Sequence, residues 1–304
     1  MIALSRPKRL RMTTTLTRAA DRRTNTEDVK SSRKNSPAPG RRRSTVTAAL
    51  AAGALLSLAA CGGNGAGGGG GDAGGEPQLI NDGKMVVAMS GEFQPFSYFE
   101  NNELTGFDYD IAVAIAEEMG LKLETKTGAF DTLIQGVKSN RYDVLIASMT
   151  PTEERDQAVD FTDSYYTSGA TMFVRNDSDC EDPTAMDGPS VGVASGTTYE
   201  SFLKEEDWVG KIRTFPSDVT ALQDVDAGRL DGAMTDRLVG LFQINEADRD
   251  LRVCGEPLYT EEPAFAVKEG NAALVEQLNE ALAAIKDDGT YAEISEKWYG
   301  QDIS

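Results

Sequence analysis

The stretch "FDYDIAVAIAEEMG" (residues 107–120) decides the fold class of this chain. Its apolar residues lie on one helical face at a spacing of three or four: Ile111, Ala114, Ile115 and Met119. Two aspartates at its start suit the positive end of a helix dipole, and Gly120 is a common stop signal. The pattern therefore predicts an amphipathic helix with one buried face.

Strand patterns flank this predicted helix on both sides. "KMVVAMS" (84–90) precedes it and "LKLETK" (121–126) follows it. A second helical stripe begins at Phe130 and leads to another strand pattern, "YDVLIASM" (142–149). Alternating strands and helices are typical of a parallel sheet with helices on both faces, so we expect an α/β fold.

The same alternation restarts at "SVGVASGTTYESFLKE" (190–205) and continues through "VTALQDVDAG" (219–228) and "LDGAMTD" (230–236). Two extended segments rich in Tyr, Thr and Pro, residues 160–174 and 256–268, join the two units. We expect two hinge-linked α/β lobes with a ligand cleft between them, where strand ends and helix N-termini meet.

The expected organisation has five parts. They are a lead-in and signal peptide (1–60), a lipidated cysteine with a glycine-rich tether (61–80), lobe one (81–164 plus 264–304), lobe two (170–258) and two hinge crossings (165–169 and 259–263).

The N-terminal region has the pattern of an export signal. Three arginines precede the uncharged residues 45–60, a run shorter than the roughly 20 residues that span a bilayer. The "LAAC" ending at Cys61 resembles the lipobox of bacterial lipoproteins, which implies that Cys61 is acylated. An ordinary signal peptide with a chance cysteine is the alternative. Glycine fills 10 of the 14 positions 62–75, as in a flexible tether. We expect an exported protein anchored to the outer face of the cell membrane.

Two further cysteines, Cys180 and Cys254, form a pair available for a disulfide in an oxidising compartment. Two unbonded buried thiols are the alternative.

Charge and composition exclude several functions. Residues 1–60 hold 13 Lys and Arg against 3 Asp and Glu, whereas the whole chain holds 30 against 49, so the body is strongly acidic. An acidic body repels phosphate backbones, and we expect no nucleic-acid partner. The chain has no histidine, which removes Ser/His and Cys/His nucleophile pairs and His-ligated zinc. No phosphate-binding glycine motif follows a strand pattern. We expect no cofactor, no metal and no enzymatic activity.

Several motifs, in this order, resemble the solute-binding proteins of bacterial ABC importers, in the class that takes polar amino acids. They are "GFDYDIAVAIAEEMG", "PFSY", "RYDVLIASMTPTEERDQAVDFTDSYY", "VGVASGTTYE", "GRLDGAMTD" and "IKDDGTYAEISEKWYG". Tyr109 departs from the family pattern, which usually has an aliphatic residue there. The resemblance covers residues 84–301. It implies a two-lobed periplasmic-binding-protein-like fold and a monomer that captures a polar amino acid and delivers it to an ABC permease. An enzyme of the dehydratase type or a ligand sensor on the same fold is the alternative.

The resemblance also implies partners for the two charged groups that every amino acid carries. Arg155 stands where the family places the clamp for the carboxylate, and a guanidinium offers two parallel donors. Without the resemblance, an arginine near the start of a helix is more often a surface residue. Asp236 matches the carboxylate that holds the ammonium group, and its alternative role is the N-cap of the next helix.

The resemblance places further residues around the ligand. They are Ser148, Thr150, Gly196, Thr197 and Thr198 for polar contacts, Phe93 and Phe130 as aromatic walls, and Ser90 and Glu92 near the ligand side chain. The alternative role of the "SGTT" segment is a turn and helix cap, for which these residue types are common. The alternative role of Phe130 is in the apolar helical stripe that it begins. Ser90 and Ala194 differ from the aspartate and lysine of glutamine binders, so the bound amino acid stays open. Glu92 either meets a cationic or amide side chain or points to solvent.

Overall fold

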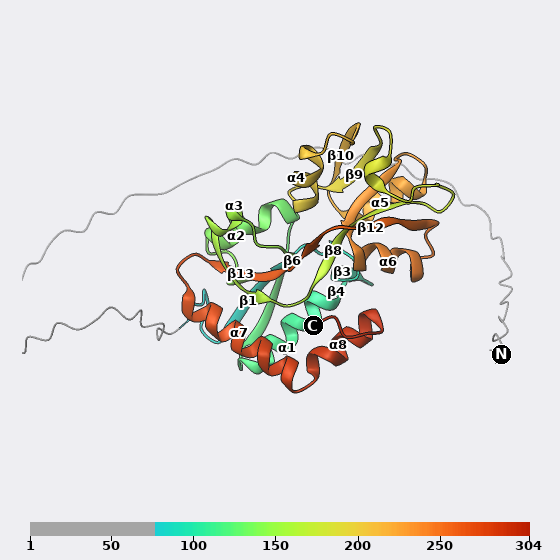
Figure 1. Ribbon diagram of the computed structural model, residues 1–304. Coiled ribbons are helices and arrows are strands. Elements are labelled where there is room, and N and C mark those ends of the chain that lie inside the picture. Colours follow the sequence, from blue (N-terminus) through green and yellow to red (C-terminus); the bar gives the residue numbers. More distant parts are fainter. Residues whose placement is uncertain (1–76) are drawn as a thin grey trace, which may run out of the picture. The chain divides into compact units, whose positions relative to one another are not determined.

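The computed structural model describes residues 77–304 (Figure 1). The predicted signal peptide, Cys61 and most of the glycine tether lie outside the described residues. Within residues 77–304, no helix combines the length and the apolar character needed to cross a membrane.

The first sheet has five strands. In spatial order they are β5 (Lys122–Thr127), β1 (Lys84–Met89), β6 (Val144–Met149), β13 (Ala264–Lys268) and β7 (Val159–Ser164). β1 pairs in parallel with β5 and β6, while β13 is antiparallel to β6 and β7. Thus the C-terminal part of the chain returns to complete the sheet that the N-terminal part begins.

Helices cover this first sheet. They are α1 (Phe107–Glu118), the 3-10 turn Phe130–Thr132 with α2 (Leu133–Lys138), α3 (Glu153–Asp156), α7 (Ala272–Asp287) and α8 (Thr290–Tyr299). The predicted helix at 107–120 is confirmed as α1, with Ile111 and Ile115 fully buried and Gly120 at a positive φ just beyond its end. Helices α7 and α8 pack against α1 (Figure 1).

The segment 91–106, between β1 and α1, forms a small sheet of its own. Its strands are β2 (Glu92–Phe93), β3 (Ser97–Glu100) and β4 (Glu103–Thr105). Asn101 and Asn102 both have positive φ, which is the turn conformation that lets two adjacent antiparallel strands pair. The Asn-Asn pair in the sequence was the signal for this hairpin.

The second sheet also has five strands. In spatial order they are β10 (Lys211–Phe215), β9 (Ser190–Ala194), β11 (Gly232–Asp236), β8 (Ser168–Arg175) and β12 (Leu251–Glu261). Its helical elements are the 3-10 turn Pro183–Ala185, α4 (Thr198–Glu205), α5 (Asp218–Asp226) and α6 (Arg237–Asn245). A disulfide joins Cys180 to Cys254 on β12, with Cα atoms 5.5 Å apart, so the predicted cysteine pairing is confirmed.

The chain passes between the two sheets twice, from β7 to β8 and from β12 to β13 (Figure 1). The two crossings run side by side: the backbone N–H of Tyr165 donates to the carbonyl of Pro263 at 3.0 Å. Tyr165 and Tyr166 are buried at this point. The lobe and hinge boundaries drawn from the sequence stay a prediction.

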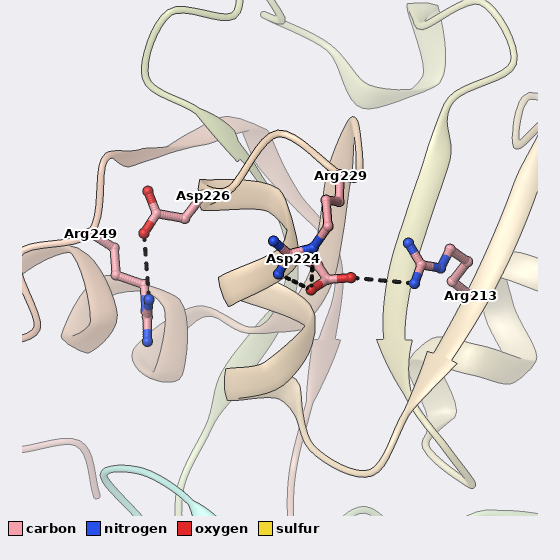
Figure 2. A network of polar contacts seen from close by, with 5 residues as sticks. All are labelled: Arg213, Asp224, Asp226, Arg229 and Arg249. Atoms are coloured by element: carbon pink, nitrogen blue, oxygen red, sulfur yellow. Dashed lines mark hydrogen bonds and ion pairs between the residues drawn. The ribbon is translucent and has the colours of Figure 1, made fainter.

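Ion pairs hold the C-terminal half of α5 in place (Figure 2). Asp224 contacts Arg229, in the loop after α5, at 2.5 Å and Arg213 on β10 at 3.3 Å. Asp226 pairs with Arg249, just before β12, at 3.4 Å. At the other end, the hydroxyl of Ser217 accepts from the N–H of Thr220 and caps the helix. Helix α5 is thereby fixed against its neighbours, and its first residue faces the cleft described next.

Candidate ligand-binding site

A partly open cleft lies between elements of the two sheets. Most of the predicted site residues line it: Ser90, Glu92, Phe93, Phe130, Ser148, Thr150, Arg155, Thr197 and Thr198. Gly196 and Asp236 do not line it. Three carboxylate residues line it, namely Glu92, Asp218 and Glu261, and sequence reasoning found only the first.

Arg155 is the cation of this cleft, and three contacts fix its guanidinium. Nη1 donates to the carbonyl of Thr150 at 2.5 Å, and Nη2 donates to the carbonyl of Gly196 at 3.0 Å. The guanidinium carbon lies 5.6 Å from the centre of the Phe130 ring, within the range of a cation–π contact. Burial lowers the pKa of Arg155, and the negative charge of Glu261 opposes that shift. An arginine nonetheless stays charged.

Among residues 77–304, no carboxylate lies within 4.0 Å of the Arg155 guanidinium, the distance of an ion pair. Its two bonded partners are neutral carbonyl groups, one on each side of the cleft. The guanidinium has five N–H donors, so further donors stay available. An incoming anion therefore meets a charge that the protein has oriented without neutralising it.

The "SGTT" segment supports the start of α4. The N–H of Gly196 donates to Glu200 at 2.7 Å, and the hydroxyl of Thr197 donates to the carbonyl of Ala194 and accepts from the N–H of Glu200. Thr198 donates its hydroxyl hydrogen to Glu261. The capping role that the sequence left open is thus present, while Thr197 and Thr198 also line the cleft.

Asp236 ends β11 and is 1% exposed, behind the lining residues. Its Oδ1 accepts from the N–H of Leu238 at 2.7 Å and from the hydroxyl of Ser168 at 2.9 Å, so it caps α6. Burial raises its pKa to about 7, and the negative charge of Glu261 adds to the rise. The capping role is therefore present, and the ammonium role stays a prediction.

Asp218 is the first residue of α5 and is 4% exposed. Its Oδ1 has no hydrogen-bond partner among the described residues. Burial raises the pKa of Asp218 to about 6, and the nearby charge of Glu261 acts in the same direction. In the sequence this residue looked like an ordinary acidic first-turn residue, because only the tertiary fold shows that it faces a cleft.

Glu261 is the last residue of β12 and is also buried, at 4% exposure. It stands on the second crossing between the sheets, where the sequence reads "YTEEP" and gives no helical or strand signal that separates it from exposed Glu262. Its charge influences Arg155, Asp218 and Asp236 alike. Glu261 is thus a buried acidic residue that lines the cleft.

A buried network supports the wall that Ser148 provides. Ser148 has a positive φ of 51°, and its N–H donates to the Tyr165 hydroxyl at 3.0 Å. The hydroxyl groups of Ser148 and Tyr165 donate to the two oxygens of Asp108, at 3.3 and 2.6 Å. Burial raises the pKa of Asp108 to about 7 against these hydrogen bonds. Asp108 thus orients Ser148 without lining the cleft.

The remaining walls are aromatic and polar. The half-buried Phe93 stacks on the buried Phe96, with ring centroids 5.1 Å apart. Glu92 is exposed, and its N–H donates to the hydroxyl of Ser90 at 3.2 Å. In the part of the chain that the structure describes, no group of three or more Cys, Asp or Glu residues is placed to hold a metal ion.

Comparisons with known proteins agree with this architecture. The chain is 33% identical over 225 residues to the L-cystine-binding protein TcyJ of Escherichia coli (strain K12), covering 73% of this chain and 85% of that protein. It is 35% identical over 228 residues to ABC transporter arginine-binding protein 1 of Escherichia coli (strain K12), covering 72% of this chain and 91% of that protein.

Solved structures confirm the expected two-lobed fold. An ancestral arginine-binding protein bound to arginine matches with a TM-score of 0.68 and 38% identity, over 72% of this chain and 99% of that one. The ancestral amino acid-binding protein AncCDT-1, a precursor of cyclohexadienyl dehydratase, matches with a TM-score of 0.66 and 34% identity, over 71% and 96%. Residues 85–301 match the model of the bacterial extracellular solute-binding proteins, family 3, and the chain belongs to that family.

Proposed function

We propose that this chain captures a free polar amino acid in the cleft between its lobes and delivers it to the permease of an ABC transporter. The observation that carries the proposal is Arg155, a buried guanidinium oriented by carbonyl groups of both lobes and left without an acidic partner among residues 77–304. A carboxylate is the ligand group that this arrangement fits best.

The same cleft offers partners for the ammonium group. The carboxylate and ammonium of an amino acid sit on one carbon, so the ammonium must bind close to Arg155. We assign it to Asp236 and Glu261 together, because Glu261 acts electrostatically on both Arg155 and Asp236. A cation bound beside two buried acids relieves the cost of burying their charge.

The two relatives named above are named for the amino acids that they bind, and we propose that this chain likewise performs no covalent chemistry. The dehydratase alternative draws only on the similarity to AncCDT-1. An amino acid incubated with the protein should be recovered unchanged by mass spectrometry, whereas its conversion would favour an enzyme.

We further propose that acylation of Cys61 tethers the protein to the outer face of the membrane. Fourteen residues of glycine-rich coil reach roughly 20 Å, which leaves the folded part free to meet a permease. Closure of the two lobes over the ligand would then present one closed form to the permease. Loss of membrane fractionation in a Cys61→Ser variant would support the anchor, and unchanged fractionation would contradict it.

A thermal-shift screen of the full chain against the twenty amino acids tests the binding function. A ligand that binds only the folded state at 100 times its dissociation constant adds about 2.7 kcal/mol of stability. We expect one or a few amino acids to raise the melting temperature. Absence of any shift, in protein refolded to remove co-purified ligand and shown to be folded, would contradict the proposal.

A further inference from the structure

Among the described residues, Asp218 is the one buried acidic residue lining the cleft for which the proposed function has no use. Its carboxylate is almost fully buried, faces the cleft and leaves Oδ1 without a hydrogen-bond partner in the described part of the chain. Burying a charged group without a partner is costly, so its retention at this place calls for a partner that arrives from outside.

No cation of the described residues takes that place. The charged group that acts on Asp218 most clearly is Glu261, which has the same sign. Arg155, the cation that lines the cleft, donates to Thr150 and Gly196 instead. The hydroxyl of Thr235 on β11 lies beside Asp218 and lowers the pKa of its carboxyl group, but a hydroxyl is neutral and supplies no charge.

The charge balance of the cleft points the same way. Buried carboxyl groups outnumber the one cation that lines the cleft: Asp218 and Glu261 line it with Arg155, and Asp236 is buried within the influence of Glu261. A zwitterionic amino acid brings one negative and one positive charge, and therefore leaves this excess unchanged. A ligand with a second positive charge reduces it.

We propose that Asp218 determines specificity by binding a positively charged group on the ligand side chain, so that the cleft prefers amino acids with an ammonium or guanidinium side chain. This inference rests on the proposed function, because it takes the backbone groups of the ligand to be held by Arg155, Asp236 and Glu261. The aromatic rings of Phe93 and Phe130 line the same cleft and suit the long apolar stem of such a side chain.

Paired ligands of equal size test the inference on the unaltered full-length chain. L-Arginine and L-citrulline differ in charge and little in shape, and L-lysine and 6-hydroxy-L-norleucine form a second pair. A hydrogen bond to a charged group contributes about 1.5–3 kcal/mol, so calorimetric titration should show the cationic member binding about 10- to 100-fold more tightly. Equal or tighter binding of the neutral member would overturn the inference while leaving amino-acid binding intact.

Substitution of Asp218 then tests whether this residue causes the preference for cationic ligands. Asp218→Asn keeps the shape of the side chain and should reduce the cationic-to-neutral ratio to within about threefold, mainly by weakening the cationic member. Asp224→Asn is the matched control: it makes the same change in the same helix, away from the cleft, and should keep the wild-type ratio. If Asp218→Asn kept the wild-type ratio of cationic to neutral affinity, the inference would be overturned. If neither these ligands nor any other amino acid binds the folded wild type, the proposed function is contradicted, and so is the inference that rests on it.

Discussion

Two aspartates of helix α5 lie six residues apart and have opposite surroundings. Asp224, 8% exposed, contacts Arg229 and Arg213, and its pKa is lowered chiefly by the hydrogen bond from Arg229 (Figure 2). Asp218, 4% exposed, has an oxygen without a hydrogen-bond partner among residues 77–304, and burial raises its pKa to about 6. The protein satisfies the carboxylate that holds the fold together and leaves unsatisfied the carboxylate that faces the cleft. Arg155 resembles Asp218 in this respect, because it lines the cleft and has no carboxylate within 4.0 Å among residues 77–304.

The largest effect is expected when the unpaired cation is removed. Arg155→Ala should weaken the binding of every amino acid alike, because the guanidinium meets the carboxylate that all of them share. Truncating one partner of a buried charge pair costs about 2–5 kcal/mol, or about 30- to 3,000-fold in the dissociation constant measured by calorimetry. A change within about twofold would show that Arg155, like Asp224, is only structural.

Asp236 and Glu261 come next, because both are assigned to the ammonium group. Asp236→Asn and Glu261→Gln should each weaken all amino acids by about 10-fold or more without changing their ranking, since a charged hydrogen bond is lost. Asparagine is a good N-cap, so Asp236→Asn should keep α6 intact. Glu262→Gln is the control for Glu261, because Glu262 is its exposed neighbour. Unchanged binding in Asp236→Asn would show that Asp236 only caps α6 and does not bind the ligand.

Measurements of stability against pH should distinguish the two aspartates of α5. Replacing Asp218 and replacing Asp224 should change the free energy of unfolding at pH 7 in opposite directions. The pKa of Asp218 rises from 3.8 to about 6 on folding, so its stabilising contribution is complete below about pH 4 and is lost as the pH rises through 6. In urea denaturation of ligand-free protein, Asp218→Asn should therefore gain free energy of unfolding at pH 7 relative to wild type. The gain should be at most about 3 kcal/mol and should disappear near pH 4.

Asp224 has the opposite linkage. Its lowered pKa means that its contribution is present above pH 3.8 and is lost as the pH falls through the folded-state value. Asp224→Asn should accordingly lose some stability at pH 7, with a difference that fades in acid. The same sign of change at pH 7 in both variants would contradict the comparison between the two ends of α5.

The smallest effect is expected at the aromatic wall. Phe93→Ala should change affinities by a few-fold and alter the ranking among amino acids, because Phe93 lines the cleft without a charged contact. The stacking of Phe93 on Phe96 means that part of the loss will appear as lower stability, which a melting curve measures. Titration with five amino acids of different side chains would check the ranking, and a uniform loss would contradict this role.

Much of the fold could be predicted from the sequence because local patterns agreed with the global structure. The periodicity of residues 107–120 and its flanking strand patterns identified α1, β1 and β5, and cysteine pairing identified the Cys180–Cys254 bridge. The sequence did not predict the hairpin of β3 and β4, because these strands are only four and three residues long and the Asn101–Asn102 turn is a weaker signal than Asn-Gly.

The site was predicted less completely. Motif resemblance brought out Arg155 and most of the lining residues, whereas Asp218 and Glu261 were not found. Their role depends on whether a carboxylate is buried without a cation, and neither a helix first turn nor a strand end shows that in the sequence. Asp236 shows the converse, because its bonds to Ser168 and Leu238 arise only once β8 and β11 are paired.

The central claim is that Arg155 holds the α-carboxylate of an amino acid. The most direct measurement is calorimetric titration of the full chain with its tightest amino acid and with the amine that lacks only the carboxyl group, agmatine in the case of L-arginine. We predict that the amine binds at least about 30-fold more weakly than the amino acid in wild type, and that Arg155→Ala largely abolishes this difference. Equal affinity of the amino acid and its amine in wild type would contradict it.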